Sequence, residues 1–181
     1  IQSMDSGDIF INGKSIKTDK VEIRKHLGLV PQDIALLEEL NAVDNLEYFG
    51  GLYGLAGAEL KSQIEKLLEV AGLTDKKKEK VKNYSGGMKR RLNIAVAMLH
   101  NPSILILDEP TKGIDVGAKA ELYKLMVELS KQGKTIIMIT SDMLELLSMS
   151  DRVMVMHEGH QVGIIPHTEL TQERVLELAS G

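Results

Sequence analysis

The chain has 181 residues, 43% of them hydrophobic, and a formal net charge of −4. This length suits one globular domain with its own core, and the acidic balance argues against nucleic-acid binding as the main activity. The lack of cysteine excludes disulfides and cysteine zinc sites. The apolar runs are too short to span a bilayer and no leader opens the chain, so membrane contact is expected to be peripheral or through a partner. Two basic runs, 76–82 and 89–91, are expected on solvated helix surfaces.

The first elements expected are antiparallel strands. Residues 5–16, DSGDIFINGKSI, alternate apolar and polar side chains around Asn12 and Gly13, which predicts a β-hairpin. The run HLGLVPQD (26–33) predicts a short strand that Pro31 stops. Gln32 is therefore expected at a strand end that opens into a loop.

Helical periodicity follows. Residues 41–72 predict a helical insertion, most clearly where Ile64, Leu67, Leu68 and Ala71 recur at helical spacing. A further helix is expected after the glycines at 86–87. Its apolar face consists of Met88, Leu92, Ala95, Val96 and Leu99, and it ends at Asn101 and Pro102.

The last third alternates strands and helices. The run SILILDEP (103–110) predicts a central parallel strand buried on both faces, and TIIMIT (135–140) predicts the next buried strand. Between them 118–132 predicts an amphipathic helix, so the pattern favours a parallel sheet covered by helices. Beyond it, residues 143–150 are expected to be helical, and 152–165 to form a second hairpin.

Two acids end the strand at 103–110. A carboxylate at the end of a buried strand suits Mg²⁺, which prefers hard oxygen ligands and keeps part of its hydration shell. Asp108 fits this metal-binding role, and the adjacent Glu109 fits a catalytic one, orienting and polarising an attacking water. The alternative is a strand whose polar end only marks its exit to solvent.

A glycine turn precedes the helix expected after residue 87. Ser85, Gly86 and Gly87 allow backbone N–H groups to approach an anion closely, and the helix dipole favours negative charge at this end. The Ser85 hydroxyl adds a donor. The alternative is an ordinary helix N-cap followed by flexible glycines.

The glycine turn YSGGM (84–88), followed along the chain by ILILDEP (104–110), resembles the signature motif followed by the Walker B motif of ABC-type ATPases. Gln32 in LVPQD resembles the Q-loop, Asp115 in KGID resembles the D-loop, and residues 6–16 resemble the early antiparallel strands. The resemblance extends through nearly the whole chain. It implies an α/β fold of the P-loop NTPase type, with a RecA-like parallel sheet, helices, an antiparallel β hairpin region and a helical subdomain.

The resemblance also implies an organisation of the chain. Residues 1–181 would be a single partial ABC ATPase domain, truncated at its N-terminal side. The subregions would be early strands and Q-loop at 1–33, a helical subdomain with the signature motif at 34–100, and the C-terminal part of the RecA-like region at 101–181.

The family's site residues carry over position by position. Two cassettes would sandwich two ATP molecules head to tail, with Ser85, Gly86 and Gly87 contacting the γ-phosphate bound by the opposite subunit. Asp115 would lie at the dimer interface. Gln32 would touch the Mg²⁺ or the attacking water and relay the nucleotide state to the helical region, because glutamine offers both a donor and an acceptor.

The sequence departs from the family in two places. It contains no GxxxxGK[ST] phosphate-binding loop, so the hypothesis is that this chain alone neither binds ATP tightly nor hydrolyses it. Ser141, in TIIMITSD, stands where many members have a catalytic histidine that contacts the γ-phosphate. Because serine is shorter, catalysis at this cassette's own site is expected to be slow.

The two halves resemble different branches of the family. Residues 29–55 and 83–102 are similar to cassettes of multidrug or polysaccharide exporters, whereas 107–123 and 141–160 are similar to the second cassette of bacterial monosaccharide importers. The chain therefore reads as a mosaic.

Three functions remain in competition. The leading one is the ATP-driven motor subunit of a membrane transporter, which implies permease subunits and a second cassette as partners, in a homo- or heterodimer. It would lie in the cytoplasm, peripheral on the inner face of the cell membrane. The others are a soluble ABC ATPase acting on ribosomes or DNA, disfavoured by the acidic charge, and a truncated or engineered fragment without enzymatic activity.

Overall fold

The computed structural model describes residues 6–180, and the chain divides into two compact units, Ile1–Met138 and Ile139–Gly181. The first unit begins with the expected hairpin, in which β1 (Phe10–Ile11) pairs antiparallel with β2 (Lys14–Ser15). Asn12 and Gly13 both have positive φ angles, of 51° and 75°, as a two-residue hairpin turn with matching twist requires. A short helix that the sequence pattern did not indicate, α1 (Lys20–Arg24), follows.

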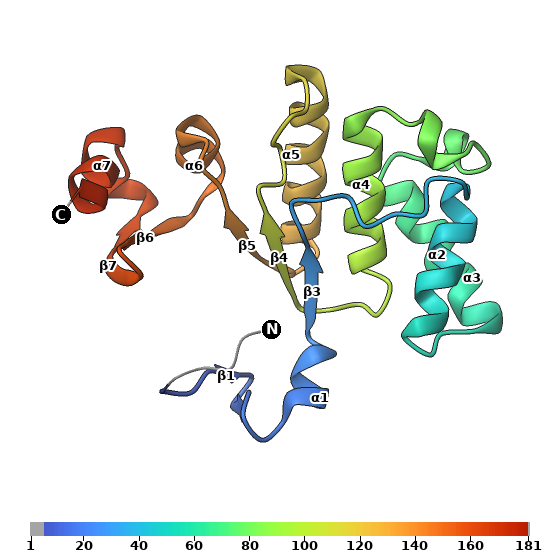
Figure 1. Ribbon diagram of the computed structural model, residues 1–181, viewed down its shortest axis with the longest axis horizontal. Helices are drawn as coiled ribbons and strands as arrows, with labels where there is room; N and C mark the ends of the chain where they lie inside the picture. The colour runs from blue at the N-terminus through green and yellow to red at the C-terminus, as the bar shows by residue number, and fades with distance from the viewer. Residues whose placement is uncertain (1–5, 181) are drawn as a thin grey trace. The chain divides into compact units, whose positions relative to one another are not determined.

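A three-stranded sheet forms the centre of the first unit, in the order β3-β4-β5 (Figure 1). Its strands are β3 (Leu27–Val30), β4 (Ile104–Asp108) and β5 (Thr135–Ile139). Strands β3 and β4 are parallel, and their register places Val30 opposite Leu107. The α/β class with a parallel sheet, helices and antiparallel hairpins is thus confirmed.

The expectations that 103–110 is a strand buried on both faces and that 135–140 is the next buried strand are wrong. In β4, Leu105 and Leu107 are buried, whereas the alternate residues are only partly buried. In β5 the alternate residues are exposed, with Ile137 at 47%, and Leu29 of β3 is 63% exposed. An apolar run does not distinguish a strand covered on two faces from one covered on a single face.

Four longer helices complete the first unit. They are α2 (Ala42–Leu52), α3 (Gly57–Val70), α4 (Gly86–Ala97) and α5 (Val116–Lys131). The predicted helical insertion is therefore two helices. Tyr53 and the positive-φ Gly54 end the first, and Gly57, also with positive φ, is the first residue of the second. Figure 1 shows α4 standing between α5 and the α2–α3 pair. Two short 3₁₀ turns, Thr74–Lys76 and Val81–Asn83, lead into α4.

Helix α4 packs directly on the sheet. A Cβ added to Gly28 of β3 would lie 2.7 Å from the backbone oxygen of Ala97 and 2.7 Å from the Cδ2 atom of Leu105. Only glycine permits this approach, which brings the end of α4 against β3. The helical region and the sheet therefore share one core in this unit.

The second unit contains the other predicted hairpin. Strands β6 (Arg152–His157) and β7 (His160–Pro166) pair antiparallel after helix α6 (Met143–Met149). The C-terminal helix α7 (Gln172–Ser180), a further element that the sequence pattern did not indicate, packs on this hairpin after the 3₁₀ turn His167–Glu169. Their core consists of Val153, Val155, Ile165 and Val175.

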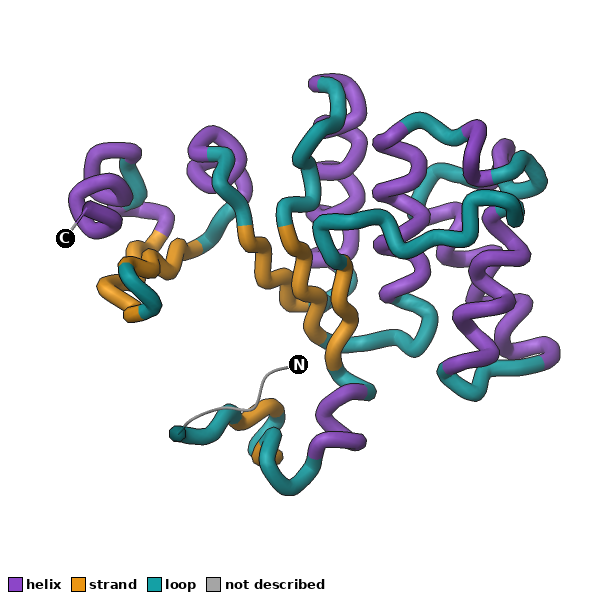
Figure 2. Tube along the Cα trace, viewed as in Figure 1, coloured by secondary structure: helices purple, strands orange, loops and turns teal. Residues whose placement is uncertain are grey.

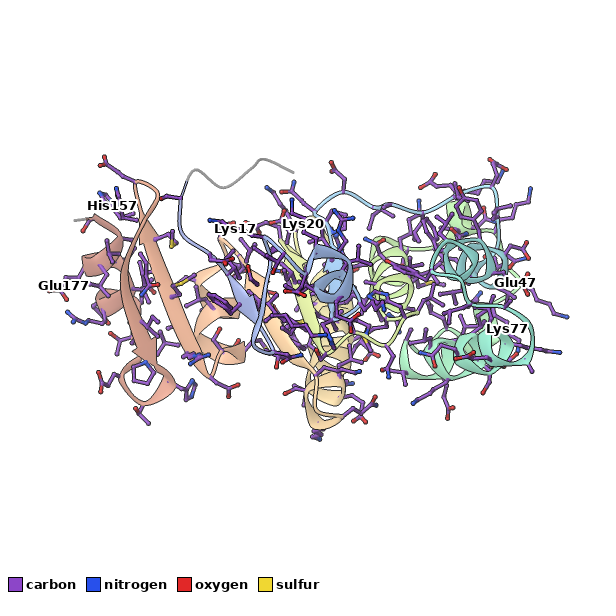
Figure 3. All side chains as sticks on the ribbon, turned by 90° about the horizontal axis from the view of Figure 1, so that it is seen from below. Lys17, Lys20, Glu47, Lys77, His157 and Glu177 are labelled. Carbon is purple, nitrogen blue, oxygen red and sulfur yellow. The ribbon has the colours of Figure 1, made fainter. Side chains whose placement is uncertain are left out.

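Charged side chains lie at the surface of the first unit. Lys17, Lys20 and Glu47 are exposed (Figure 3). The basic run 76–82 is largely exposed, as predicted, but lies in turns rather than on a helix, and Lys80 and Lys82 both pair with Glu39.

Among residues 6–180, no helix combines the length and apolar character needed to cross a membrane.

His100 should make stability depend on pH. Its Nε2 lies 2.9 Å from the carbonyl oxygen of Leu27, and its ring stacks on Tyr53 with centroids 4.2 Å apart. Because a carbonyl only accepts, Nε2 carries the proton. Burial lowers the pKa of His100 by more than the hydrogen bond to Leu27 raises it, and the nearby charge of Lys134 lowers it further. The folded state therefore resists protonation more than the unfolded state does.

We therefore expect the free energy of unfolding to fall as the pH drops below about 6.5, the ordinary histidine pKa, and to continue falling towards the lowered folded value. His100→Gln should remove this part of the pH dependence, measured by urea unfolding between pH 7.5 and 5. The carboxylates of Glu22, Glu39 and Glu121 have a pKa lowered below 4.5 by lysine partners, so they act in a separate, more acidic window. Identical pH profiles for both proteins would contradict the expectation.

Candidate functional site

The ends of β3 and β4 form one edge of the site. Since Val30 pairs with Leu107 in a parallel ladder, the two chains leave the sheet side by side, with Gln32 two residues beyond Val30 and Asp108 directly after Leu107. Asp108 is partly buried and Gln32 is exposed in the long loop that runs from β3 to the helical region (Figure 2). The fold thus brings the amide and the carboxylate predicted for the metal to the same end of the sheet.

Glu109 follows Asp108 in a strained conformation. Its φ angle is 45°, in the left-handed region that residues other than glycine rarely occupy. Such a residue costs about 1–3 kcal/mol and persists only where its surroundings enforce it. The next two residues, Pro110 and Thr111, are buried. This conformation turns the backbone at the end of β4, at the residue predicted to be the catalytic carboxylate.

The glycine turn caps α4. The Ser85 hydroxyl oxygen accepts a hydrogen bond from the Met88 N–H at 3.2 Å, and both Ser85 and Gly86 are exposed. The preceding Tyr84 is buried and donates its hydroxyl to the carbonyl oxygen of Lys76 at 2.7 Å, and burial raises its pKa. The N-cap interpretation of Ser85 is therefore correct, and the turn also presents the helix N-terminus at the surface.

The predicted D-loop residue lies beside this turn. Asp115 caps α5 by accepting a hydrogen bond from the Ala118 N–H at 2.9 Å. A Cβ added to Gly87 would lie 2.5 Å from the Cβ of Ala118, and one added to Gly86 would lie 3.5 Å from Ile114. The starts of α4 and α5 are thus in direct contact, which brings the glycine turn and Asp115 together.

Sequence reasoning missed one residue of this region, Arg90. The run 89–91 was expected on a solvated surface, but Arg90 is only 4% exposed and its Nη1 donates to the carbonyl oxygen of Pro31 at 2.9 Å. The sequence offered no signal for this burial, because Arg90 and the equally buried Asn93 are polar and lie off the apolar face predicted for this helix. Composition alone suggested solvent.

Ser141 belongs to the second unit. It is exposed, lies between β5 and α6, and precedes Asp142, whose carboxylate caps α6 by accepting from the N–H groups of Leu144 and Glu145. The Thr140 hydroxyl donates to the buried carboxylate of Glu145. The catalytic role expected for Ser141 stays a prediction.

The side chains at this edge of the sheet are suitable ligands for Mg²⁺. Asp108, Glu109 and Gln32 offer hard oxygen atoms. In the described part of the chain, no group of three histidine, cysteine, aspartate or glutamate side chains converges to hold a metal ion by itself. A magnesium ion here would depend on water and phosphate oxygens for its remaining ligands, as it commonly does in nucleotide sites.

Comparison with known proteins identifies the family of the chain. The family model described as "ABC transporter" matches residues 1–112. The chain therefore belongs to the ABC transporter family, and its sheet and helices are part of the P-loop NTPase fold of an ABC nucleotide-binding domain.

Similar proteins come from more than one branch of that family. The chain is 42% identical to a putative ribose/galactose/methyl galactoside import ATP-binding protein of Geobacillus kaustophilus, over 98% of this chain and 37% of that protein. It is 38% identical to the linearmycin resistance ATP-binding protein LnrL of Bacillus subtilis, over 92% of this chain and 53% of that protein. It is 40% identical to the ribose import ATP-binding protein RbsA of Bacillus cereus, over 99% and 38% respectively. The chain thus spans between about a third and a half of the length of these relatives.

The contact between the two helix starts gives a direct test. Gly87→Ala should lower the free energy of unfolding by about 1–3 kcal/mol, because its Cβ would overlap the Ala118 side chain. Gly86→Ala is the matched control: its Cβ meets Ile114 at an ordinary 3.5 Å, so stability should change little. Urea unfolding of both variants measures the difference, and equal stabilities would show that α4 packs more loosely on α5 than these distances imply.

Proposed function

We propose that this chain is part of the ATP-binding and ATP-hydrolysing motor subunit of an ABC membrane transporter, which couples ATP hydrolysis to substrate transport. The observation that carries the proposal is the shared edge of β3 and β4, where Gln32, Asp108 and Glu109 leave the sheet together. Family membership and the similarity to import and resistance ATP-binding proteins support it.

The roles at the sheet edge follow from chemistry. Asp108 would hold Mg²⁺, through water or directly, with Gln32 as a second oxygen donor. Glu109 would orient and polarise the attacking water. Ser141 would stand where a longer side chain commonly contacts the γ-phosphate, so its short hydroxyl predicts slow turnover. The ion itself would supply charge neutralisation for the phosphate oxygens.

The roles at the helix start concern a second nucleotide. The first N–H groups of α4 lack acceptors one turn earlier in the helix, which makes this end a favourable place for an anion. Ser85 and Gly86 are exposed there. We propose that Ser85, Gly86 and Gly87 contact ATP bound mainly by another cassette, and that Asp115, beside them, lies at the interface of this homo- or heterodimer.

The proposed setting is peripheral to a membrane. Permease subunits would span the bilayer, and the cassette would lie on its cytoplasmic face, with the helical region of α2 and α3 towards the permease. We propose that the chain forms one partial ABC domain, with subregions 1–33, 34–100 and 101–181, and that nucleic acid is not its partner.

A second candidate is favoured by one feature of the sequence. The 181 residues contain no GxxxxGK[ST] segment, the usual source of backbone amides and lysine for the β- and γ-phosphates. On its own, this chain would then be a cassette fragment without enzymatic activity, able only to present its glycine turn to another subunit.

Nucleotide turnover by the isolated chain tests the second candidate. The purified chain with Mg²⁺ and ATP should show neither tight binding of a fluorescent ATP analogue nor phosphate release above buffer. Glu109→Gln is the control for contaminating ATPase. Turnover by the wild-type chain that is lost in Glu109→Gln would overturn the non-enzymatic interpretation and show that the chain binds its own nucleotide.

Mixing with an intact cassette tests the role of the glycine turn. Added to such a cassette, the chain should raise ATP binding, and Gly86→Asp should abolish the increase, because a carboxylate would repel the γ-phosphate. Exposed Glu121→Gln on α5 is the matched surface control and should behave as wild type. An increase that survives Gly86→Asp would argue against the glycine turn as a phosphate contact.

A further inference from the structure

Arg90 has a charged side chain that is almost completely buried. It lies on the first half of α4 and is 4% exposed. Its Nη1 atom is 2.9 Å from the carbonyl oxygen of Pro31, the residue directly before Gln32. The guanidinium therefore holds the start of the loop that leaves β3.

Two carboxylates act on the same guanidinium. Burial lowers the pKa of Arg90, but the negative charges of Asp33 and Asp108 both favour its charged form. Asp33 belongs to the loop that contains Gln32, and Asp108 ends β4. The guanidinium is therefore bonded to the loop after β3, and its charge is favoured by the acids of that loop and of the end of β4.

The hydrogen bonding of Arg90 is incomplete. Its Nε atom is buried and has no hydrogen-bond partner in the part of the chain that the structure describes. Burying a charge with an unpaired donor is unfavourable, and apolar residues of similar volume often stabilise such positions equally well. Stability alone therefore gives a weak account of an arginine here, whereas a planar, rigid group with several donors suits the positioning of carboxylate and carbonyl groups.

We propose that Arg90 is a positioning residue for the proposed ATPase: its guanidinium holds the loop from Pro31 beside Asp108, so that Gln32 and Asp108 keep the separation at which both reach one Mg²⁺–nucleotide. The inference rests on the proposed function for its consequence in catalysis. Its structural part, the tether between α4 and the Gln32 loop, stands independently of that function.

The tether is tested on the purified chain by NMR. In Arg90→Met, the backbone ¹⁵N order parameters of Gln32 and Asp33 should fall from about 0.85, typical of rigid backbone, to below about 0.6. Arg90→Lys, which keeps the charge and one donor to the Pro31 carbonyl, should restore them in part. If Arg90→Met does not fold, the comparison of Arg90→Lys with wild type still gives the result, because lysine loses the planar fork.

Arg91 provides the matched control. It is the next residue of α4, and its Nη1 donates to the carbonyl oxygen of Ala71 at the end of α3, also at 2.9 Å. Arg91→Met should leave the order parameters of Gln32 and Asp33 unchanged. Equal loosening of the loop by Arg91→Met, or unchanged order parameters in both Arg90 variants, would overturn the proposal.

The catalytic consequence is measured where the chain is assembled with an intact cassette. The ATPase activity that Glu109→Gln removes from this assembly is the part that depends on this chain's own site. In that part Arg90→Met should lower kcat at least tenfold with little change in KM, and Arg90→Lys should recover part of the loss. If the loop loosens but Glu109→Gln removes no ATPase activity from the assembly, the proposed function fails and the tether stands. If the wild-type assembly is active and Arg90→Met equals it, the positioning role fails and the proposed function stands.

Discussion

The parallel pairing of β3 with β4 is the constraint on which the candidate site depends. A parallel ladder brings strands far apart in sequence to the same edge, and the register of Val30 with Leu107 fixes which residues leave that edge together. A slip of one residue would turn the alternate side chains of β4 to the opposite face and would shift Asp108 relative to Gln32. The close approach of Gly28 to α4 holds β3 in this register against the helix.

Helix α4 connects the sheet with the other parts of the first unit. Its N-terminus carries the glycine turn, its first half carries Arg90, and its end packs on β3. Because Gly87 packs closely against Ala118, the start of α5 is in direct contact with the start of α4. The glycine turn and the residue that bonds the loop after β3 therefore belong to the same helix.

Capping and phosphate binding need not be alternatives at such a helix start. Ser85 and Asp115 each accept a backbone N–H at the start of a helix, which gives both residues a structural reason to be present. The same bonds fix the orientation of the turn and leave Ser85 and Gly86 at the surface. A cap of this kind pre-organises a surface for an anion rather than competing with it.

The sequence by itself determined the local structure and the order of the chemistry. The Asn12–Gly13 hairpin, the apolar faces of the helices and the acids that end β4 all follow from short-range patterns, because turn conformation and helical spacing depend on neighbouring residues. Tertiary structure alone decided which face of the sheet is covered, since an apolar run such as that of β5 looks the same in either case. It also decided that Arg90 is buried while the neighbouring basic residues are less so, because burial depends on what a fold places opposite a side chain. The Pro31 carbonyl, distant in sequence, comes within hydrogen-bond distance of Arg90 only in the folded chain.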